Sequence, residues 1–123
     1  MHVQVHVDVQ ASRVEVTFTG PVSFADRVEV LDQVGPEIVE KQIKGVLVDY
    51  SQAWVNEPSV KDYEALASRL RSASYMAGLN VALVNPPEFH AVPTEEVAPR
   101  AGFTVRRFAS RTSAIAWLER ELA

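Results

Sequence analysis

The chain has 123 residues, of which 47% are hydrophobic, and a net charge of −4 at pH 7. This length fits one domain, residues 1–123, with enough apolar side chains for a core. The acidic balance argues against a nucleic-acid surface, which needs a basic excess. The absence of cysteine excludes disulfides, thiolate metal sites and thiol catalysis. No apolar run approaches the about 20 residues of a membrane span, and no signal-peptide segment opens the chain, so we expect a cytoplasmic protein.

The first elements are two strands. Residues 3–9 and 14–18 alternate valine or phenylalanine with polar residues, which is the pattern of a strand with one buried face. Residues 10–12 are short enough to join them as a hairpin. Gly20-Pro21 then ends the second strand.

A helix follows. Ser23 is a favourable N-cap residue, and Asp26 can complete a capping box with it. Apolar residues spaced by three and four then form one stripe, consisting of Phe24, Val28, Leu31 and Val34. Gly35-Pro36 interrupts this stripe, which predicts that the helix ends there and that a short second helix covers residues 36–41.

Residues 45–60, GVLVDYSQAWVNEPSV, carry the strongest indication of a site. The apolar run 46–48 ends in Asp49 and is typical of a strand buried on both faces. Ser59 then marks the start of another helix. Because α/β proteins build their sites at the carboxyl ends of such strands, we expect a site between Asp49 and Ser59.

The second half of the chain alternates helices and strands. The predicted elements are a helix at about 60–76, a strand at 81–84, a short helix from 94, a strand at 103–108 and a helix at 110–122. This order indicates right-handed crossovers between parallel strands. The fold class is therefore α/β: a five-stranded, mostly parallel sheet with an antiparallel N-terminal hairpin strand and about four helices.

This order and several local sequences resemble the STAS domain family, and more closely the bacterial SpoIIAA-like proteins, also described as STAS/SEC14-like. The likeness is carried by residues 45–51, the helix from Ser59, residues 80–85 and the ending FASRTSAIAWL at 108–118. It spans nearly the whole chain. The resemblance implies a non-enzymatic regulatory or protein-interaction domain like the anti-sigma factor antagonists. From the residues themselves we expect no metal and no cofactor, since cysteine is absent and His2 and His6 are too far apart along an extended strand to share one metal ion.

The resemblance also implies a phosphorylation candidate. In STAS antagonists a partner kinase phosphorylates the second serine of an Asp-Ser-Ser-Gly type motif, which follows the central strand at a fixed interval. Counted from Asp49, this motif falls on Glu57-Pro58-Ser59-Val60, which keeps only the acidic class and one serine. Ser59 is thus the phosphorylation candidate. The simpler interpretation is that its hydroxyl caps the following helix, and the two roles are compatible.

Asp49, Trp54 and Glu57 are candidates for contact with a partner or ligand. Trp54 lies between alanine and valine in the predicted loop. Such an aromatic residue either contacts a partner or lipid, or folds back as a lid over the strand end. A carboxylate in the position of Asp49 more often accepts hydrogen bonds from backbone N–H groups of the following loop, and we favour that role.

The other polar residues give weaker indications. His90 stands alone in a proline-rich loop, and no hydrolase, P-loop, dinucleotide or zincin motif is present. Four arginines between 100 and 111 could receive an anion or an acidic partner. Charged residues that protect an exposed edge strand are the more usual explanation for them.

Two functional hypotheses follow. In the first, residues 49–62 are presented to a protein partner such as a regulatory kinase or an anti-sigma-like factor, and a homodimer is a further expected form of association. In the second, the chain carries a small apolar, lipid-like ligand between helices and sheet, under Trp54, Phe89 and Phe103. An enzyme is the least supported class.

Overall fold

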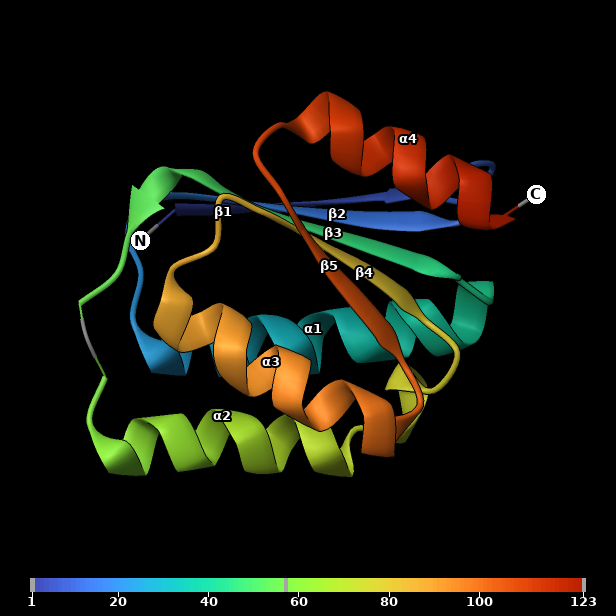
Figure 1. The fold of residues 1–123 in the computed structure, drawn as a ribbon. Coiled ribbons are helices and arrows are strands. Elements are labelled where there is room, and N and C mark those ends of the chain that lie inside the picture. Colours follow the sequence, from blue (N-terminus) through green and yellow to red (C-terminus); the bar gives the residue numbers. More distant parts are fainter. Residues whose placement is uncertain (1, 57, 123) are drawn as a thin grey trace.

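The computed structural model describes residues 2–56 and 58–122. Five strands form one sheet in the order β1-β2-β3-β4-β5 (Figure 1). The elements are β1 (His2–Asp8), β2 (Arg13–Pro21), α1 (Phe24–Lys41), β3 (Gly45–Trp54), α2 (Val60–Ser72), the 3-10 helix η1 (Ser74–Met76), β4 (Asn80–Val84), α3 (Glu88–Ala101), β5 (Thr104–Phe108) and α4 (Arg111–Leu122). β1 pairs antiparallel with β2, and the other pairs are parallel. The predicted fold class is confirmed.

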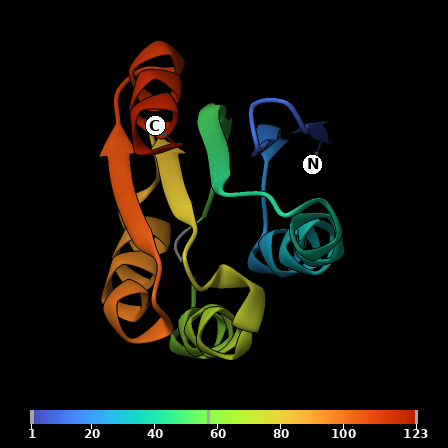
Figure 2. The ribbon, with the colours of Figure 1, turned by 90° about the vertical axis from the view of Figure 1, so that its right-hand side faces the viewer.

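The helices lie in two layers. α1, α2 and α3 are on one face of the sheet, and α4 is on the other (Figures 1 and 2). Alternation along β2 and β3 directs Val16, Phe18 and Val46 into the large core beneath α1, α2 and α3. A smaller core beneath α4 consists of Leu47, Ala82, Val84, Ala114, Trp117 and Leu118. Helices on both faces explain why the central strands are apolar throughout.

α1 runs unbroken from Phe24 to Lys41, so the predicted break at Gly35-Pro36 is wrong. Pro36 is exposed, and solvent can therefore bond the helix carbonyl that lacks its usual donor. Gly35 is buried because the ring of Tyr75 packs against it, 2.8 Å from where a Cβ would stand. The helix ends instead at Gln42, which adopts a left-handed conformation with φ of 53°.

Two other boundaries differ from prediction. β3 continues to Trp54, because β2 extends to Pro21 and pairs with it there, so Trp54 ends a strand rather than lying in a loop. α3 starts at Glu88 rather than near residue 94 and contains two prolines. His90 therefore lies in a helix, where it is buried.

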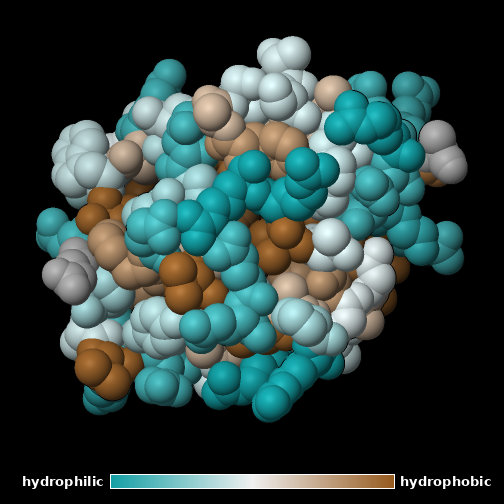
Figure 3. Space-filling view, viewed as in Figure 1, coloured by the Kyte–Doolittle hydropathy of each residue, from teal (hydrophilic) through white to brown (hydrophobic). Residues whose placement is uncertain are grey.

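No helix among residues 2–56 and 58–122 has the length and apolar character needed to cross a membrane. On the face formed by α2 and α3, hydrophilic side chains cover most of the surface and apolar ones appear as separate patches (Figure 3).

Candidate functional site

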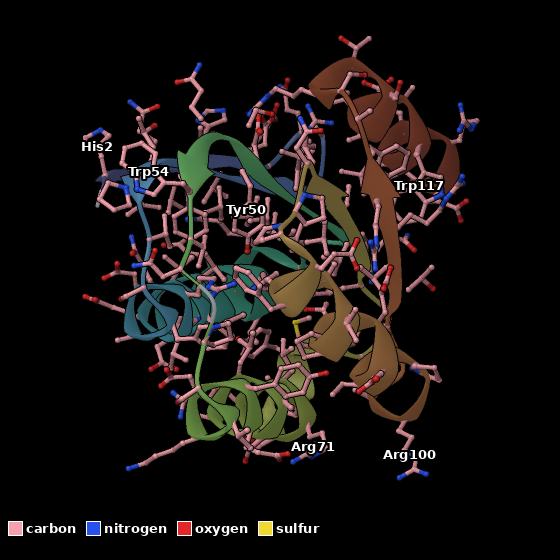
Figure 4. The ribbon with its side chains drawn as sticks, turned by 60° about the vertical axis from the view of Figure 1, so that its left-hand side comes forward. His2, Tyr50, Trp54, Arg71, Arg100 and Trp117 are labelled. Atoms are coloured by element: carbon pink, nitrogen blue, oxygen red, sulfur yellow. The ribbon has the colours of Figure 1, made fainter. Side chains whose placement is uncertain are left out.

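The carboxyl end of β3 lies beside the start of α1. The carbonyl oxygen of Trp54 accepts a hydrogen bond from the backbone N–H of Val22 at 3.0 Å, which fixes the strand end. The Trp54 side chain is nevertheless 63% exposed. Figure 4 shows it at the periphery, whereas Tyr50 of the same strand lies inside, between sheet and helices. Trp54 is therefore not a lid over the strand end.

Two surface grooves flank the start of α2. One, of about 290 Å³, is lined by Trp54, Pro58, Asp62 and the first residues of α1, including Asp26. The other, of about 300 Å³, is lined by Pro58, Ser59, Val60, Tyr63 and Phe89. Val60 is 80% exposed. The start of α2 thus forms a ridge between two grooves, with apolar side chains on both sides.

Ser59 caps α2 in a complete capping box. Its Oγ accepts a hydrogen bond from the N–H of Asp62 at 3.1 Å, and Asp62 Oδ2 accepts one from the N–H of Ser59 at 3.4 Å. Ser23 and Asp26 make the same pair of bonds at the start of α1, at 3.1 and 2.9 Å. Ser59 is an exposed residue, and its capping bond to Asp62 lies at the surface.

We expect Ser59→Ala to lower the free energy of unfolding by about 1 kcal/mol, because the N–H of Asp62 loses the side-chain acceptor that caps α2. Urea denaturation measures the loss. Ser23→Ala is the matched control, since it removes the same cap from α1. Ser59→Asp, which keeps an acceptor at the cap, should recover most of the stability. A loss well below that of Ser23→Ala would show that the cap at α2 contributes little.

Asp49 does not line either groove. Its Oδ1 accepts a hydrogen bond from the N–H of Ser51 at 2.8 Å, which agrees with the favoured interpretation of this residue. Its Oδ2 accepts one from Nη1 of Arg111 at 3.0 Å. Burial alone would raise the pKa of Asp49, but the bonds from Ser51 and Arg111 hold the pKa below its ordinary value. Asp49 is thus an ionised structural group beside α4.

Arg111 connects α4 to the sheet through further bonds. It contacts Glu15 and donates to Thr17 Oγ1 at 3.2 Å. Glu15 also accepts a bond from Nε of Arg13 at 2.9 Å. This network was not predicted as a unit, although strand alternation places Glu15 and Asp49 on the same face. At least one of the four C-terminal arginines therefore holds elements together rather than only protecting an edge.

Glu57, the remaining binding candidate, lies outside the described residues. The structure thus brings Trp54 and Ser59 to neighbouring grooves, and it places Asp49 on the other face of the sheet, beneath α4. Among residues 2–56 and 58–122, no three His, Asp or Glu side chains are grouped to hold a metal ion.

An internal cavity of about 60 Å³ lies between the sheet and the helices α1, α2 and α3. It lies between helices and sheet, as the second hypothesis expects for an apolar ligand, but Trp54, Phe89 and Phe103 are not among its lining residues. An apolar cavity that binds benzene has a volume of about 150 Å³. The present cavity therefore cannot hold a lipid chain unless the core repacks.

No family model and no curated protein matches the sequence. Solved structures do resemble it. Phosphorylated SpoIIAA, described as a Bacillus cell fate determinant, is 13% identical with a TM-score of 0.61, over 95% of this chain and 99% of the other. Unphosphorylated SpoIIAA, an anti-sigma factor antagonist, is also 13% identical, with a TM-score of 0.54 over 95% and 97% of the two chains.

A third structure is a Shewanella loihica protein with a SpoIIAA-like fold, 16% identical, with a TM-score of 0.53 over 95% of this chain and 92% of the other. The chain has the SpoIIAA-like, STAS-type fold. In this SpoIIAA-like domain, the sequence and the surface geometry both point to the ridge at the start of α2.

Proposed function

We propose that this chain is a non-enzymatic regulatory domain that binds a protein partner through the Trp54–Val60 surface, meaning Trp54, Pro58, Ser59, Val60 and the grooves beside them. One observation carries the proposal. Trp54 and Val60 are 63% and 80% exposed, and both lie at the ends of the connection between β3 and α2. Large apolar side chains exposed together in this way are typical of contact surfaces.

The charge of the surface indicates the chemistry of the partner. Asp26 and Asp62 line the groove beside Trp54, and the capping bonds that they accept from Ser23 and Ser59 fix their positions. A tryptophan ring next to carboxylates favours a partner segment with an arginine, whose guanidinium can stack on the ring and pair with the acid. We therefore propose a partner with apolar and basic side chains.

Phosphorylation of Ser59 is the proposed means of regulation. A phosphate there adds a charge of about −1.5 to −2 next to Asp62 and can take up the free N–H groups at the helix start. It would repel the Asp62 carboxylate and open the capping box. The resemblance to an antagonist solved in a phosphorylated form supports this proposal, and a kinase or an anti-sigma-like factor is the proposed class of partner.

Trp54→Ala should reduce recovery of the partner at least about tenfold, because an exposed aromatic anchor contributes about 2 kcal/mol or more to binding. The measurement is quantitative co-purification from the native host, with a photocrosslinking residue at position 60. Val39→Ala is the matched control, since Val39 is 65% exposed at the far end of α1. Equal recovery with both variants, or crosslinking at position 39 but not at 60, would contradict the proposal.

The same samples test the regulatory part by intact-protein mass spectrometry. We expect a mass increase of one phosphate in part of the wild-type protein and none in Ser59→Ala. Phosphate found on another serine would leave the contact surface in place and overturn its regulation through Ser59.

A further inference from the structure

The internal cavity is apolar over most of its wall. Its aliphatic lining comes from β3, β4, α1 and α2 and includes Val30, Val34, Val46, Val48, Leu70 and Leu83. Polar side chains reach it from one group of residues: Arg27 of α1, Tyr50 of β3, and His90 and Thr94 of α3. The cavity therefore combines an aliphatic wall with a small number of polar groups, as small-molecule sites do.

Arg27 is the unusual member of this wall. It is only 2% exposed. None of its three guanidinium nitrogens Nε, Nη1 and Nη2 has a hydrogen-bond partner among the described residues. The Phe24 ring lies 3.9 Å from the guanidinium carbon and supplies a cation–π contact, but that contact accepts none of the in-plane N–H bonds. The Tyr50 hydroxyl is close enough to act as an acceptor that raises the pKa of Arg27, yet it does not reach the geometry of a hydrogen bond with any of these nitrogens. The five donors of this buried guanidinium are therefore poorly satisfied.

The charge of Arg27 is also poorly compensated. Burial lowers the pKa of Arg27, and the nearby Tyr50 and Asp62 only partly offset this. Arginine nevertheless stays protonated inside proteins. The Asp62 carboxylate is already an acceptor in the capping box. A buried cation without a paired anion destabilises the folded state, and a bound anion would relieve this.

A second unpartnered nitrogen lies nearby. Nδ1 of His90 is buried and, among the described residues, has no hydrogen-bond partner. The His90 ring lies 5.1 Å from that of Tyr50, centroid to centroid, so both belong to the same polar end of the cavity. Burial and the charge of Arg27 lower the pKa of His90 well below its ordinary value. The imidazole is therefore neutral at pH 7 and can donate one N–H bond.

We propose that the cavity binds a short-chain monocarboxylate of the acetate or propionate class, with its carboxylate on Arg27 and its alkyl group against the aliphatic wall. The guanidinium fork matches the two oxygens of a carboxylate in one plane, so that two parallel N–H bonds form. His90 donates to one of the same oxygens. This site lies in the interior and is independent of the Trp54–Val60 surface.

Size and charge exclude other anions. The volume of about 60 Å³ exceeds the space that one water needs and is less than half of the cavity that admits benzene. A tail of one or two carbons fits this space, whereas a fatty acid does not. Phosphate and sulfate carry further oxygens that the aliphatic wall cannot hydrogen-bond, so their desolvation would not be repaid.

The test is a titration of the 15N-labelled protein with sodium acetate, propionate, butyrate and hexanoate, followed by NMR. Sodium chloride and sodium phosphate at equal ionic strength are the reference salts. We expect saturable shifts at the amides of cavity residues such as Val34 and Leu83 with acetate or propionate, and weaker binding as the tail grows to hexanoate. Absence of saturable binding by any carboxylate, or equal binding of phosphate, would overturn the proposal.

Variants locate the binding group. Arg27→Leu should weaken acetate binding at least about tenfold, as expected for loss of a charge-assisted pair, while Arg27→Lys keeps the charge and loses the fork. Arg71→Leu on the outer side of α2 is the control (Figure 4), and it should bind like the wild type. Unchanged acetate affinity in a folded Arg27→Leu variant would overturn the proposed site. If that variant does not fold, the series of carboxylates with longer tails, titrated into the wild-type protein, tests whether the cavity binds a short-chain carboxylate.

Discussion

Arg111→Ala should lower the free energy of unfolding by about 2 to 3 kcal/mol, because it leaves the nearly buried Asp49 without its cation and leaves Glu15 with Arg13 alone. The side chains of Glu15 and Asp49 are only 12% and 11% exposed, and Arg111 contacts both. Arg111 itself is 37% exposed, so we place the loss below the 3 to 5 kcal/mol found when a fully buried pair is broken. Urea denaturation at neutral pH measures it.

Arg107→Ala is the matched control. Arg107 also contacts two carboxylates, Glu88 and Glu95, but their side chains are 72% and 35% exposed. Exposed pairs contribute at most about 1 kcal/mol, since water screens them. Similar losses in the two variants would contradict the argument that burial makes the Arg111 network important.

The pH dependence gives a second criterion for Arg111. In the folded protein the pKa values of Glu15 and Asp49 lie below their ordinary values, with burial opposed by bonds from the neighbouring arginines and from Ser51. Stability from such carboxylates is present above the unfolded pKa and is lost as the pH falls through the folded pKa. Without Arg111 the folded pKa values rise, so acid unfolding should move to higher pH.

The fold was predictable because its signals are local. Alternation in residues 3–9 and 14–18, and the apolar run at 46–48, depend only on neighbours a few positions away. The resulting order of strands and helices leaves few topologies open. The structure confirms five strands with one antiparallel pair at the N-terminal edge.

Two of the wrong boundaries involve proline. Pro36 lies inside a helix that was predicted to break there, and Pro93 lies inside a helix that was predicted to start only near residue 94. Two conditions decide whether a proline ends a helix. The first is that the backbone carbonyl left without its N–H partner can accept a hydrogen bond from another donor. The second is that the rest of the helix buries enough apolar surface. In α3 this second condition dominates, since His90, Ala91, Val97 and Ala98 are buried on both sides of Pro93. Tertiary packing of this kind is not visible in local sequence.

The contacts of the candidate site also differ in whether they could be predicted from local sequence. Ser59 and Asp62 are three residues apart, and the capping box was predictable from that spacing. Asp49 and Arg111 are separated by 62 positions, so their hydrogen bond could not be predicted from the spacing of residues in the sequence. Arg27 lies one turn after Phe24 in the helix. Phe24 and Val34 of the predicted apolar stripe are buried, but Val28 and Leu31 are only half-buried, and Arg27 and Val30 are buried instead. A single arginine in an amphipathic helix ordinarily indicates an exposed position.

Acidification from about pH 7 to about pH 5 should lower the free energy of unfolding, and His90 should account for most of this change. His90 is buried, and desolvation together with the charge of Arg27 lowers its pKa well below 6.5. The unfolded chain therefore binds a proton below pH 6.5 that the folded protein does not. Stability from this residue is present above the unfolded pKa and decreases as the pH falls, by at most about 1.4 kcal/mol per pH unit.

The other groups around His90 do not titrate in this range. Arg27 stays charged, and burial raises the pKa of Tyr50. His90→Gln should therefore remove most of the slope between about pH 7 and about pH 5, as measured by urea denaturation at a series of pH values. His6→Gln, on the exposed face of β1, is the control and should keep it. An unchanged slope in His90→Gln would mean that this imidazole takes up its proton inside the folded protein, and would require the Arg27 end of the cavity to open to water.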